Sequence, residues 1–322
     1  MLKHLMILGG AILFCACTSE APLTSTAPTA QPPAVEAKAP SPSTEIKPQS
    51  GPTPVVVPVT VLNRDGENAL NLMQRDFHLF EDDQEQKITG FGAVDAPFNV
   101  ALLLDTSSSV GFKVEDIQYA ATAFVEQLRP QDRVMVVSFN KEVYLNAEFT
   151  SDRSQLRRAI DGIRGGSGTR LYDAVETALA KHLKPIDGRK AVVLFTAGAD
   201  TASQTATART STQLAEESGA IIYTIRYVVD DDAAPTDAKA DGPGAQYLRE
   251  LTERTGARSY RTATTDHLKK AFSMIPVELR QQYTLSYYPT NTKRDGLYRR
   301  LSIKVERPEM TVYARPGYRA AK

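Results

Sequence analysis

The chain has 322 residues, of which 42% are hydrophobic and 24% charged, an ordinary globular composition sufficient for one large or two small domains. Lysine plus arginine equals aspartate plus glutamate at 38 each, so no overall field favours nucleic acid. The two cysteines are Cys15 and Cys17, which excludes disulfides, thiolate metal sites and a cysteine nucleophile from the remaining sequence.

Residues 1–16 are predicted to be a lipoprotein signal peptide. A basic head at Lys3 precedes the apolar run Leu5–Phe14, which is too short to span a bilayer. Ala16 stands directly before Cys17, as in a bacterial lipobox, so Cys17 is the expected lipidation site. The alternatives are an uncleaved anchor or an ordinary signal peptide cut elsewhere. Diacylation at Cys17 would give a stable membrane tether in the cell envelope, at an outer membrane or outer surface rather than in the cytoplasm.

Residues 17–52 are predicted to be a disordered tether. They consist mainly of Thr, Ser, Ala and Pro. Such a segment buries too little apolar surface to offset its ordering entropy. An extended tether of this length would hold a folded body away from the membrane.

Residues 53–94 are predicted to form a small N-terminal β segment. The run Val55–Leu62 is rich in β-branched residues, and a turn signal follows it at Asn63–Gly66. Two further short strands are expected at Phe77–Phe80 and Lys87–Phe91.

From residue 95 to residue 282, buried strands alternate with amphipathic helices. This succession predicts a doubly wound, mostly parallel α/β sheet. Buried strands are expected at 100–104, 133–139, 191–195 and 220–225, and the first is continuously apolar, as expected where both faces are covered. Helices are expected around 117–128, 156–163, 171–183, 244–255 and 265–280.

The C-terminal segment, residues 283–322, is again β in character. Strands are expected at Tyr283–Tyr288, Tyr298–Val305 and Thr311–Ala314. Neither this set nor the N-terminal set is large enough to be stable alone. We therefore predict that the two sets pack together as one β module.

Three loops offer chemistry at the carboxyl ends of the predicted strands, where open α/β sheets bind ligands. They are Asp105–Ser109, Gly165–Thr169 and Thr196–Asp200. Hydroxyls and one or two carboxylates that meet at such an edge suit a hard cation. Mg²⁺ commonly keeps several waters, so a sparse protein shell is sufficient and leaves a coordination position for an acidic group of a partner.

The order of these residues resembles a von Willebrand factor A-type domain. Asp105-x-Ser107-x-Ser109 is followed by Thr169 in a Gly-Ser-Gly-Thr-Arg-Leu-Tyr-Asp run, and then by a strand that ends in Thr-x-Gly-x-Asp200. In that family these positions form a metal-ion-dependent adhesion site. The resemblance implies Asp105, Ser107, Ser109 and Thr169 as metal ligands.

The resemblance covers about residues 97–282 and extends to the flanks. Asp76-Phe-x-Leu-x-Glu-Asp, and Tyr313 followed by Arg315-Pro-Gly-Tyr318, resemble a bacterial subgroup with flanking β segments. The whole chain is thus expected to be a bacterial lipoprotein that carries a Rossmann-like domain of this family.

One departure from the family pattern weakens the expected metal site. The usual Thr-Asp-Gly reads Thr196-Ala197-Gly198 here, so one carboxylate ligand is lost. Asp200, three residues further on, is a further candidate ligand. Fewer charged ligands predict weak binding of Mg²⁺, or of Mn²⁺ or Ca²⁺. The alternative role for Asp105 and the serines is to cap the following helix.

The resemblance implies a binding or adhesion module that recognises a protein partner, with a cation as bridge. The alternatives are a metal-free scaffold in an envelope complex and, with less support, a hydrolase that activates water with a metal. No Gly-x-Ser-x-Gly elbow and no Gly-Lys-Ser/Thr phosphate loop occurs in the sequence. We therefore expect no enzymatic activity, no nucleic-acid partner, and contact with a membrane only through the N-terminal lipid.

Overall fold

The computed structural model describes residues 53–93, 96–228 and 242–321. The signal peptide and tether predicted within residues 1–52 lie outside this part of the chain. Within it, no helix combines the length and the apolar character needed to cross a membrane.

The centre of the fold is a six-stranded sheet with the order β10-β9-β8-β5-β6-β7. All neighbouring strands run parallel except β6 and β7, which pair antiparallel at one edge. The strands are β5 (Phe98–Asp105), β6 (Arg133–Phe139), β7 (Val143–Thr150), β8 (Arg189–Thr196), β9 (Ile221–Tyr227) and β10 (Ser259–Thr262).

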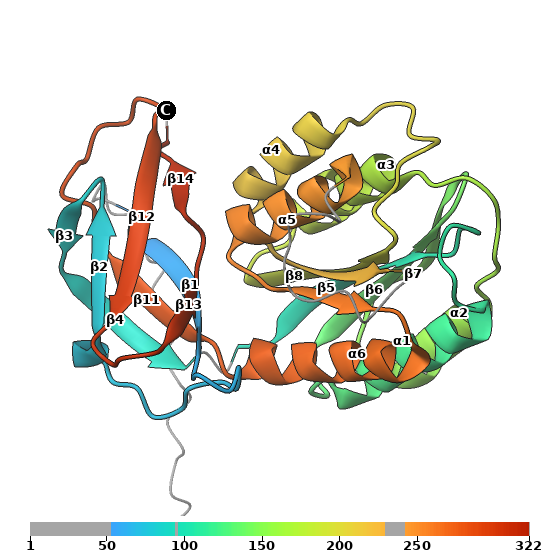
Figure 1. Cartoon of the computed structure of the whole chain (residues 1–322). Helices are drawn as coiled ribbons and strands as arrows, with labels where there is room; N and C mark the ends of the chain where they lie inside the picture. Colours follow the sequence, from blue (N-terminus) through green and yellow to red (C-terminus); the bar gives the residue numbers. More distant parts are fainter. Residues whose placement is uncertain (1–52, 94–95, 229–241, 322) are drawn as a thin grey trace, which may run out of the picture. The chain divides into compact units, whose positions relative to one another are not determined.

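Helices cover both faces of this sheet (Figure 1). One face carries α1 (Val114–Gln127), α2 (Arg153–Asp161) and α6 (Thr265–Arg280). The other carries α3 (Leu171–Glu176) with its π-helical continuation η2 (Thr177–Leu183), together with α4 (Ala208–Ser218) and α5 (Pro243–Thr255). The doubly wound α/β fold predicted from the sequence is confirmed.

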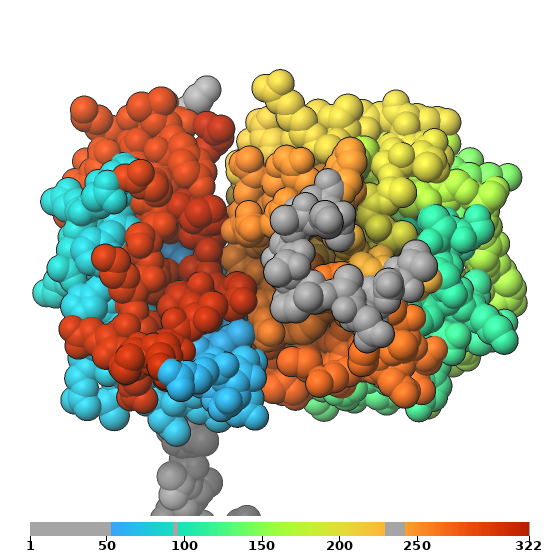
Figure 2. All heavy atoms as spheres, viewed as in Figure 1, coloured from blue at the N-terminus to red at the C-terminus, as the bar shows by residue number. Residues whose placement is uncertain are grey.

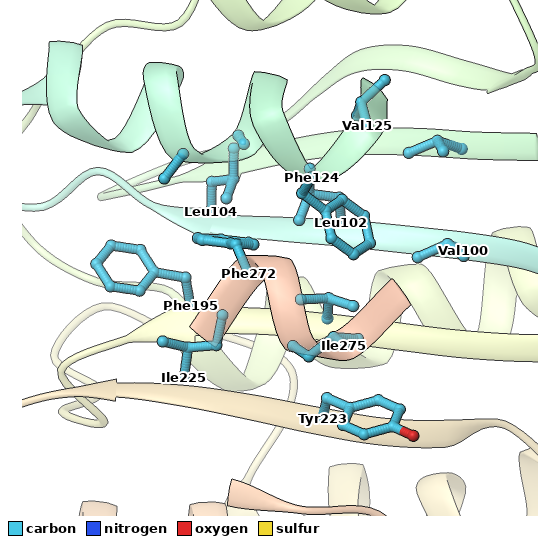
Figure 3. Packing of buried hydrophobic residues seen from close by; sticks show 14 of the residues in the cluster. Val100, Leu102, Leu104, Phe124, Val125, Phe195, Tyr223, Ile225, Phe272 and Ile275 are labelled. Atoms are coloured by element: carbon cyan, nitrogen blue, oxygen red, sulfur yellow. The ribbon is translucent and has the colours of Figure 1, made fainter. Parts of the chain in front are cut away.

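Burial on both faces explains why the central strands are continuously apolar. In β5, Leu102 and Leu104 face α1 and α6, where the rings of Phe124 and Phe272 meet at 5.9 Å between centroids (Figure 3). The alternate residue Leu103 packs against α3 and its neighbours. All of these side chains are fully buried, as in a parallel sheet covered by helices.

Two strands of the sheet were not among those predicted. In the edge strand β7, Tyr144 and Leu145 are both exposed, so the segment shows neither a buried run nor a regular alternation. Strand β10, at the other edge, has only four residues. Edge strands bury less apolar surface than central ones, which removes the pattern that identifies a strand.

The flanking segments form two four-stranded antiparallel sheets, ordered β13-β1-β11-β4 and β14-β12-β2-β3. Residues from both sheets form one hydrophobic core. Each sheet contains strands from both ends of the chain, and Figure 2 shows their atoms, cyan and red, gathered in one body. The predicted packing of both flanks into one β module is confirmed. The elements are β1 (Val55–Leu62), η1 (Gln74–Asp76), β2 (Phe77–Glu81), β3 (Gln84–Gln86), β4 (Ile88–Ala93), β11 (Tyr283–Tyr287), β12 (Tyr298–Val305), β13 (Thr311–Tyr313) and β14 (Gly317–Arg319).

A histidine on this module bridges two acidic side chains. Nδ1 of His78 lies 2.7 Å from Oε1 of Glu85, and its Nε2 lies 2.8 Å from Oε1 of Glu306. These hydrogen bonds favour the protonated ring and raise the pKa of His78, while burial opposes the shift. Lys304 lies opposite His78 in the β2–β12 pairing, but its ammonium group contacts the Phe80 ring rather than the two glutamates.

We predict that His78 makes the stability of the protein depend on pH. Because its pKa is raised by folding, its contribution is complete below about pH 6.5 and is lost as the pH rises through the raised pKa. Replacement His78→Gln should remove this decrease in stability with rising pH, because glutamine does not titrate. Urea unfolding of wild type and variant across this pH window measures the difference. The matched variant Glu306→Gln should reduce the pH dependence without abolishing it, and identical profiles for wild type and His78→Gln would contradict the prediction.

Candidate cation-binding site

The structure brings the three predicted loops together at the carboxyl ends of β5 and β8. Ser107 forms a parallel bridge with Gly166, and the amide of Ser108 donates to the Gly166 carbonyl at 3.0 Å. The hydroxyl of Thr196, the last residue of β8, donates to Oδ2 of Asp105 at 2.6 Å. Loops that are far apart in the sequence therefore share one hydrogen-bonded edge.

Four of the predicted ligand side chains lie in this edge. Oγ of Ser107 is 2.6 Å from Oγ of Ser109, which is 3.5 Å from Oγ1 of Thr169. Oδ1 of Asp105 accepts the Ser107 amide at 2.9 Å. Asp105 and Thr169 are buried, whereas Ser109 is exposed, so the group of oxygens can be reached from solvent.

The carboxyl group of Asp105 is the electrostatic centre of the cluster. Burial raises its pKa, because a carboxylate removed from water is costly. Hydrogen bonds from Ser107, Thr196 and the Ala197 amide oppose the shift, but all of these donors are neutral. A cation at this edge would compensate the buried charge in a way that neutral donors do not.

The oxygen spacing fits a small divalent cation. Mg²⁺ binds six oxygens at about 2.1 Å in octahedral geometry, which places adjacent ligands about 3.0 Å apart. The two hydroxyl separations, 2.6 and 3.5 Å, lie on either side of that value. Within the described ranges no group of three His, Cys, Asp or Glu side chains is arranged to hold a metal. Hydroxyls and one carboxylate, Asp105, are what this site offers.

Asp200, the fifth candidate ligand, has other partners. Its Oδ1 accepts from the Tyr172 amide at 3.2 Å and from the Ser203 hydroxyl at 2.5 Å, and its Oδ2 accepts from the Ser203 amide at 3.3 Å. The carboxylate thus joins the first turn of α3 to the loop after β8. No hydrogen bond between Asp200 and the other four candidates occurs among the described residues.

The predicted alternative, capping of the next helix by Asp105 and the serines, is not what the structure shows. Helix α1 begins at Val114, and its N-cap residue Lys113 makes no side-chain capping bond. The oxygens of Asp105 instead bind the Ser107 amide and the Thr196 hydroxyl. The loop therefore has a conformation that capping of α1 does not explain.

Sequence reasoning missed residues that hold the ligand-bearing loops in place. Asp173 accepts hydrogen bonds from the amides of Gln204, Thr205 and Ala206. Burial raises the pKa of Asp173, but these bonds outweigh it and the pKa is lowered. The hydroxyl of Thr201 accepts the amide of Thr169 at 2.9 Å. Asp173 belongs to the run that carried the family resemblance, yet its partners lie in a separate loop.

Solved structures of similar fold come from several organisms. A von Willebrand factor type A structure from Catenulispora acidiphila has 10% identity, covers 85% of this chain and 75% of its own, and gives a TM-score of 0.48. The conserved hypothetical protein BatB of Bacteroides thetaiotaomicron has 17% identity, with 56% and 98% covered and a TM-score of 0.44. Proximal thread matrix protein 1 of the mussel byssus, solved with a zinc-occupied MIDAS motif, has 17% identity, with 62% and 49% covered and a TM-score of 0.48.

This chain spans about half the length of the mussel protein. No curated protein matches the sequence. Residues 99–271 match the von Willebrand factor type A domain family. Because the matched segment is more than half of the chain, the protein belongs to this family of protein-interaction and adhesion modules.

Proposed function

We propose that the protein is displayed on the cell envelope and recognises a protein partner through the strand-end site, with a divalent cation as the bridge. The observation that carries the proposal is the hydroxyl cluster of Ser107, Ser109 and Thr169 beside the buried Asp105, open to solvent at Ser109. An acidic side chain of the partner would fill a coordination position that the protein leaves open.

Asp105, Ser107, Ser109 and Thr169 would hold the cation, with water in the remaining positions. Mg²⁺ is the expected ion, and Mn²⁺ or Ca²⁺ could replace it, because all the donors are oxygens. We infer that Asp200 acts indirectly, by joining α3 to the loop after β8. With Ala197 in place of a carboxylate, the affinity for the ion is weak until a partner contributes its own charge.

Binding rather than catalysis is the function proposed. Members of this family generally act as non-catalytic adhesion or scaffold modules. Water activation by a metal also needs a base to accept the proton. Among the described residues, His78 and His182 bind glutamates away from this cluster, and neither is a hydrogen-bond partner of the oxygens that would hold the ion.

Replacement Ser109→Ala should weaken Mg²⁺ binding at least about fivefold, because one of few oxygen ligands is lost while the exposed position tolerates alanine. Isothermal titration calorimetry and the shift in melting temperature at millimolar Mg²⁺ measure the effect. Ser108→Ala is the matched control: Ser108 is the adjacent exposed serine, and its interaction with Gly166 is made through the backbone amide. Asp105→Ala should abolish the shift in melting temperature caused by Mg²⁺, and it should also lower stability because Asp105 is buried.

The same pair of variants tests the partner. Crosslinking capture from the native envelope should yield a protein that is lost with chelator and with Ser109→Ala, but kept with Ser108→Ala. Capture that is equal under all four conditions would contradict the cation bridge and support a metal-free scaffold. No melting shift with Mg²⁺, Mn²⁺ or Ca²⁺ would remove the metal from the proposal and leave the fold unaffected.

Replacement Ala197→Asp should strengthen Mg²⁺ binding about tenfold or more, because it adds a second carboxylate beside Asp105. Ala197 directly follows β8, is partly exposed, and packs against the core that α1 and α6 cover. Calorimetry on wild type and variant compares the affinities. Ala199→Asp, at an exposed position two residues on, controls for added negative charge alone. Equal gains in both variants would indicate general attraction rather than a completed site.

Envelope display depends on Cys17, outside the described residues. Replacement Cys17→Ser should move the protein from the membrane to the soluble fraction of lysed cells, because the lipid attachment site is lost. Cys15→Ser, two residues earlier, should leave it in the membrane. Mass spectrometry of the mature N-terminus measures the acyl mass directly. Retention of Cys17→Ser in the membrane would instead favour an uncleaved apolar anchor.

A further inference from the structure

A cavity lies at the amino ends of the sheet strands, away from the cation site. Its volume is about 540 Å³, within the range of roughly 300–1,000 Å³ typical of small-molecule sites. Phe98, Arg189 and Ile221, the first residues of β5, β8 and β9, line it. Because Asp105 and Thr196 stand at the opposite ends of β5 and β8, the two sites are separate.

The wall of this cavity is largely apolar. Phe98 and Ile221 contribute from the sheet, Ala215 from α4, and Val56 and Pro58 from β1. Phe98, Ala215 and Ile221 are buried, whereas Val56 is 49% exposed. An apolar wall of this kind accepts a hydrocarbon or aromatic group, and the few polar groups on it determine the orientation of the ligand.

Arg315 is a cation on this wall with unsatisfied hydrogen-bonding capacity. Its Nη2 donates to the Val56 carbonyl at 3.0 Å, but its buried Nε has no hydrogen-bond partner among the described residues. No ion pair joins Arg315 to a carboxylate in that part of the chain. Burial lowers the pKa of Arg315, as expected for a guanidinium withdrawn from water.

The other arginines on the wall have partners. Arg254 pairs with Glu216. Arg189 donates to the carbonyls of Ala96 and Leu279, and its guanidinium lies 3.6 Å from the centre of the Phe98 ring. Arg315 is therefore the arginine of this cavity whose guanidinium can form an ion pair with an anionic ligand.

The Arg-Pro-Gly-Tyr motif at the C-terminus fixes Arg315 in this position. The Tyr318 hydroxyl donates to Oε2 of buried Glu81 at 2.8 Å, and the Arg315 guanidinium lies 5.5 Å from the Tyr318 ring. Gly317 allows close approach of β12, because a Cβ atom there would lie 2.3 Å from the Arg299 carbonyl oxygen. The contacts of Gly317 and Tyr318 thus hold the backbone next to Arg315 in place.

We propose that this cavity binds an amphipathic monoanion, a long-chain carboxylate, whose head group pairs with Arg315 while its chain lies on the apolar wall. A single charge is specified because one guanidinium is free to pair and because Asp187 and Glu216 also line the cavity. A phosphate dianion would be repelled by these two carboxylates more strongly than a monoanion, while Lys190 is the other cation on the wall. This inference is independent of the cation site.

Calorimetric titration of the full chain with dodecanoate tests the proposal, with dodecanol and dodecyl phosphate as comparison probes. Dodecanoate should bind one site per chain with micromolar affinity, and dodecanol about tenfold more weakly or less. Arg315→Gln should weaken dodecanoate binding about tenfold or more and leave dodecanol unchanged. Arg64→Gln, at an arginine side chain that is 73% exposed, is the matched control and should bind like wild type.

A second variant tests the location without removing a charge. Val56→Trp should occupy the part of the cavity beside Arg315 and weaken dodecanoate binding, while its melting temperature stays near that of wild type because Val56 is half exposed. The new indole would also be the sole tryptophan of the chain, so its fluorescence reports on the wall directly. Dodecanoate binding unchanged in Arg315→Gln or Val56→Trp, tighter binding of dodecyl phosphate than of dodecanoate, or no binding below about 1 mM would each overturn the proposal.

Discussion

The short hydrogen bond from Thr196 to the buried carboxylate of Asp105 is the interaction on which the candidate site depends. The two oxygens are 2.6 Å apart, and the bond joins the last residues of the adjacent parallel strands β5 and β8. All the donors to this carboxylate are neutral, so it has no cationic partner. The Ser107 amide, bound to the other oxygen, turns the loop back over the strand end. This turn directs the Ser109 hydroxyl toward Thr169. The geometry of the cluster therefore follows from how one buried charge is satisfied.

Much of this fold could be predicted because the buried strands of a parallel sheet are recognisable in the sequence as apolar runs. A strand such as β5 is apolar at every position from Val100 to Leu104, since helices cover both faces. The pairing of the chain ends into one β module could be predicted because each set alone is too small to be stable. Strand β7 could not, because its position at the edge leaves Tyr144 and Leu145 exposed and removes any regular pattern.

The site could be predicted to the level of its loops but not to the level of each partner. Parallel strands bring their carboxyl ends to one edge, so Asp105 and Thr196 had to lie near each other. Whether Asp200 points to a cation or to α3 depends on the path of its loop, which its bonds with Tyr172 and Ser203 define. Asp173 likewise acquires its role only where the loop returns beside α3. Such contacts are properties of the tertiary structure and leave no local signal.

Charges that are wholly or partly removed from water divide into those that the fold pairs with an opposite charge and those that it does not. Glu278 is buried, and its Oε1 pairs with Arg258 and accepts the Tyr260 hydroxyl, so its charge is balanced within the structure although its Oε2 has no hydrogen-bond partner among the described residues. Asp105 and Arg315 carry opposite charges at separate sites, and neither has an oppositely charged side chain bound to it among the described residues. Burying a charge without a counter-charge costs stability. A ligand of opposite charge would lower that cost at buried Asp105 and at half-buried Arg315, and this is the physical basis of both proposals.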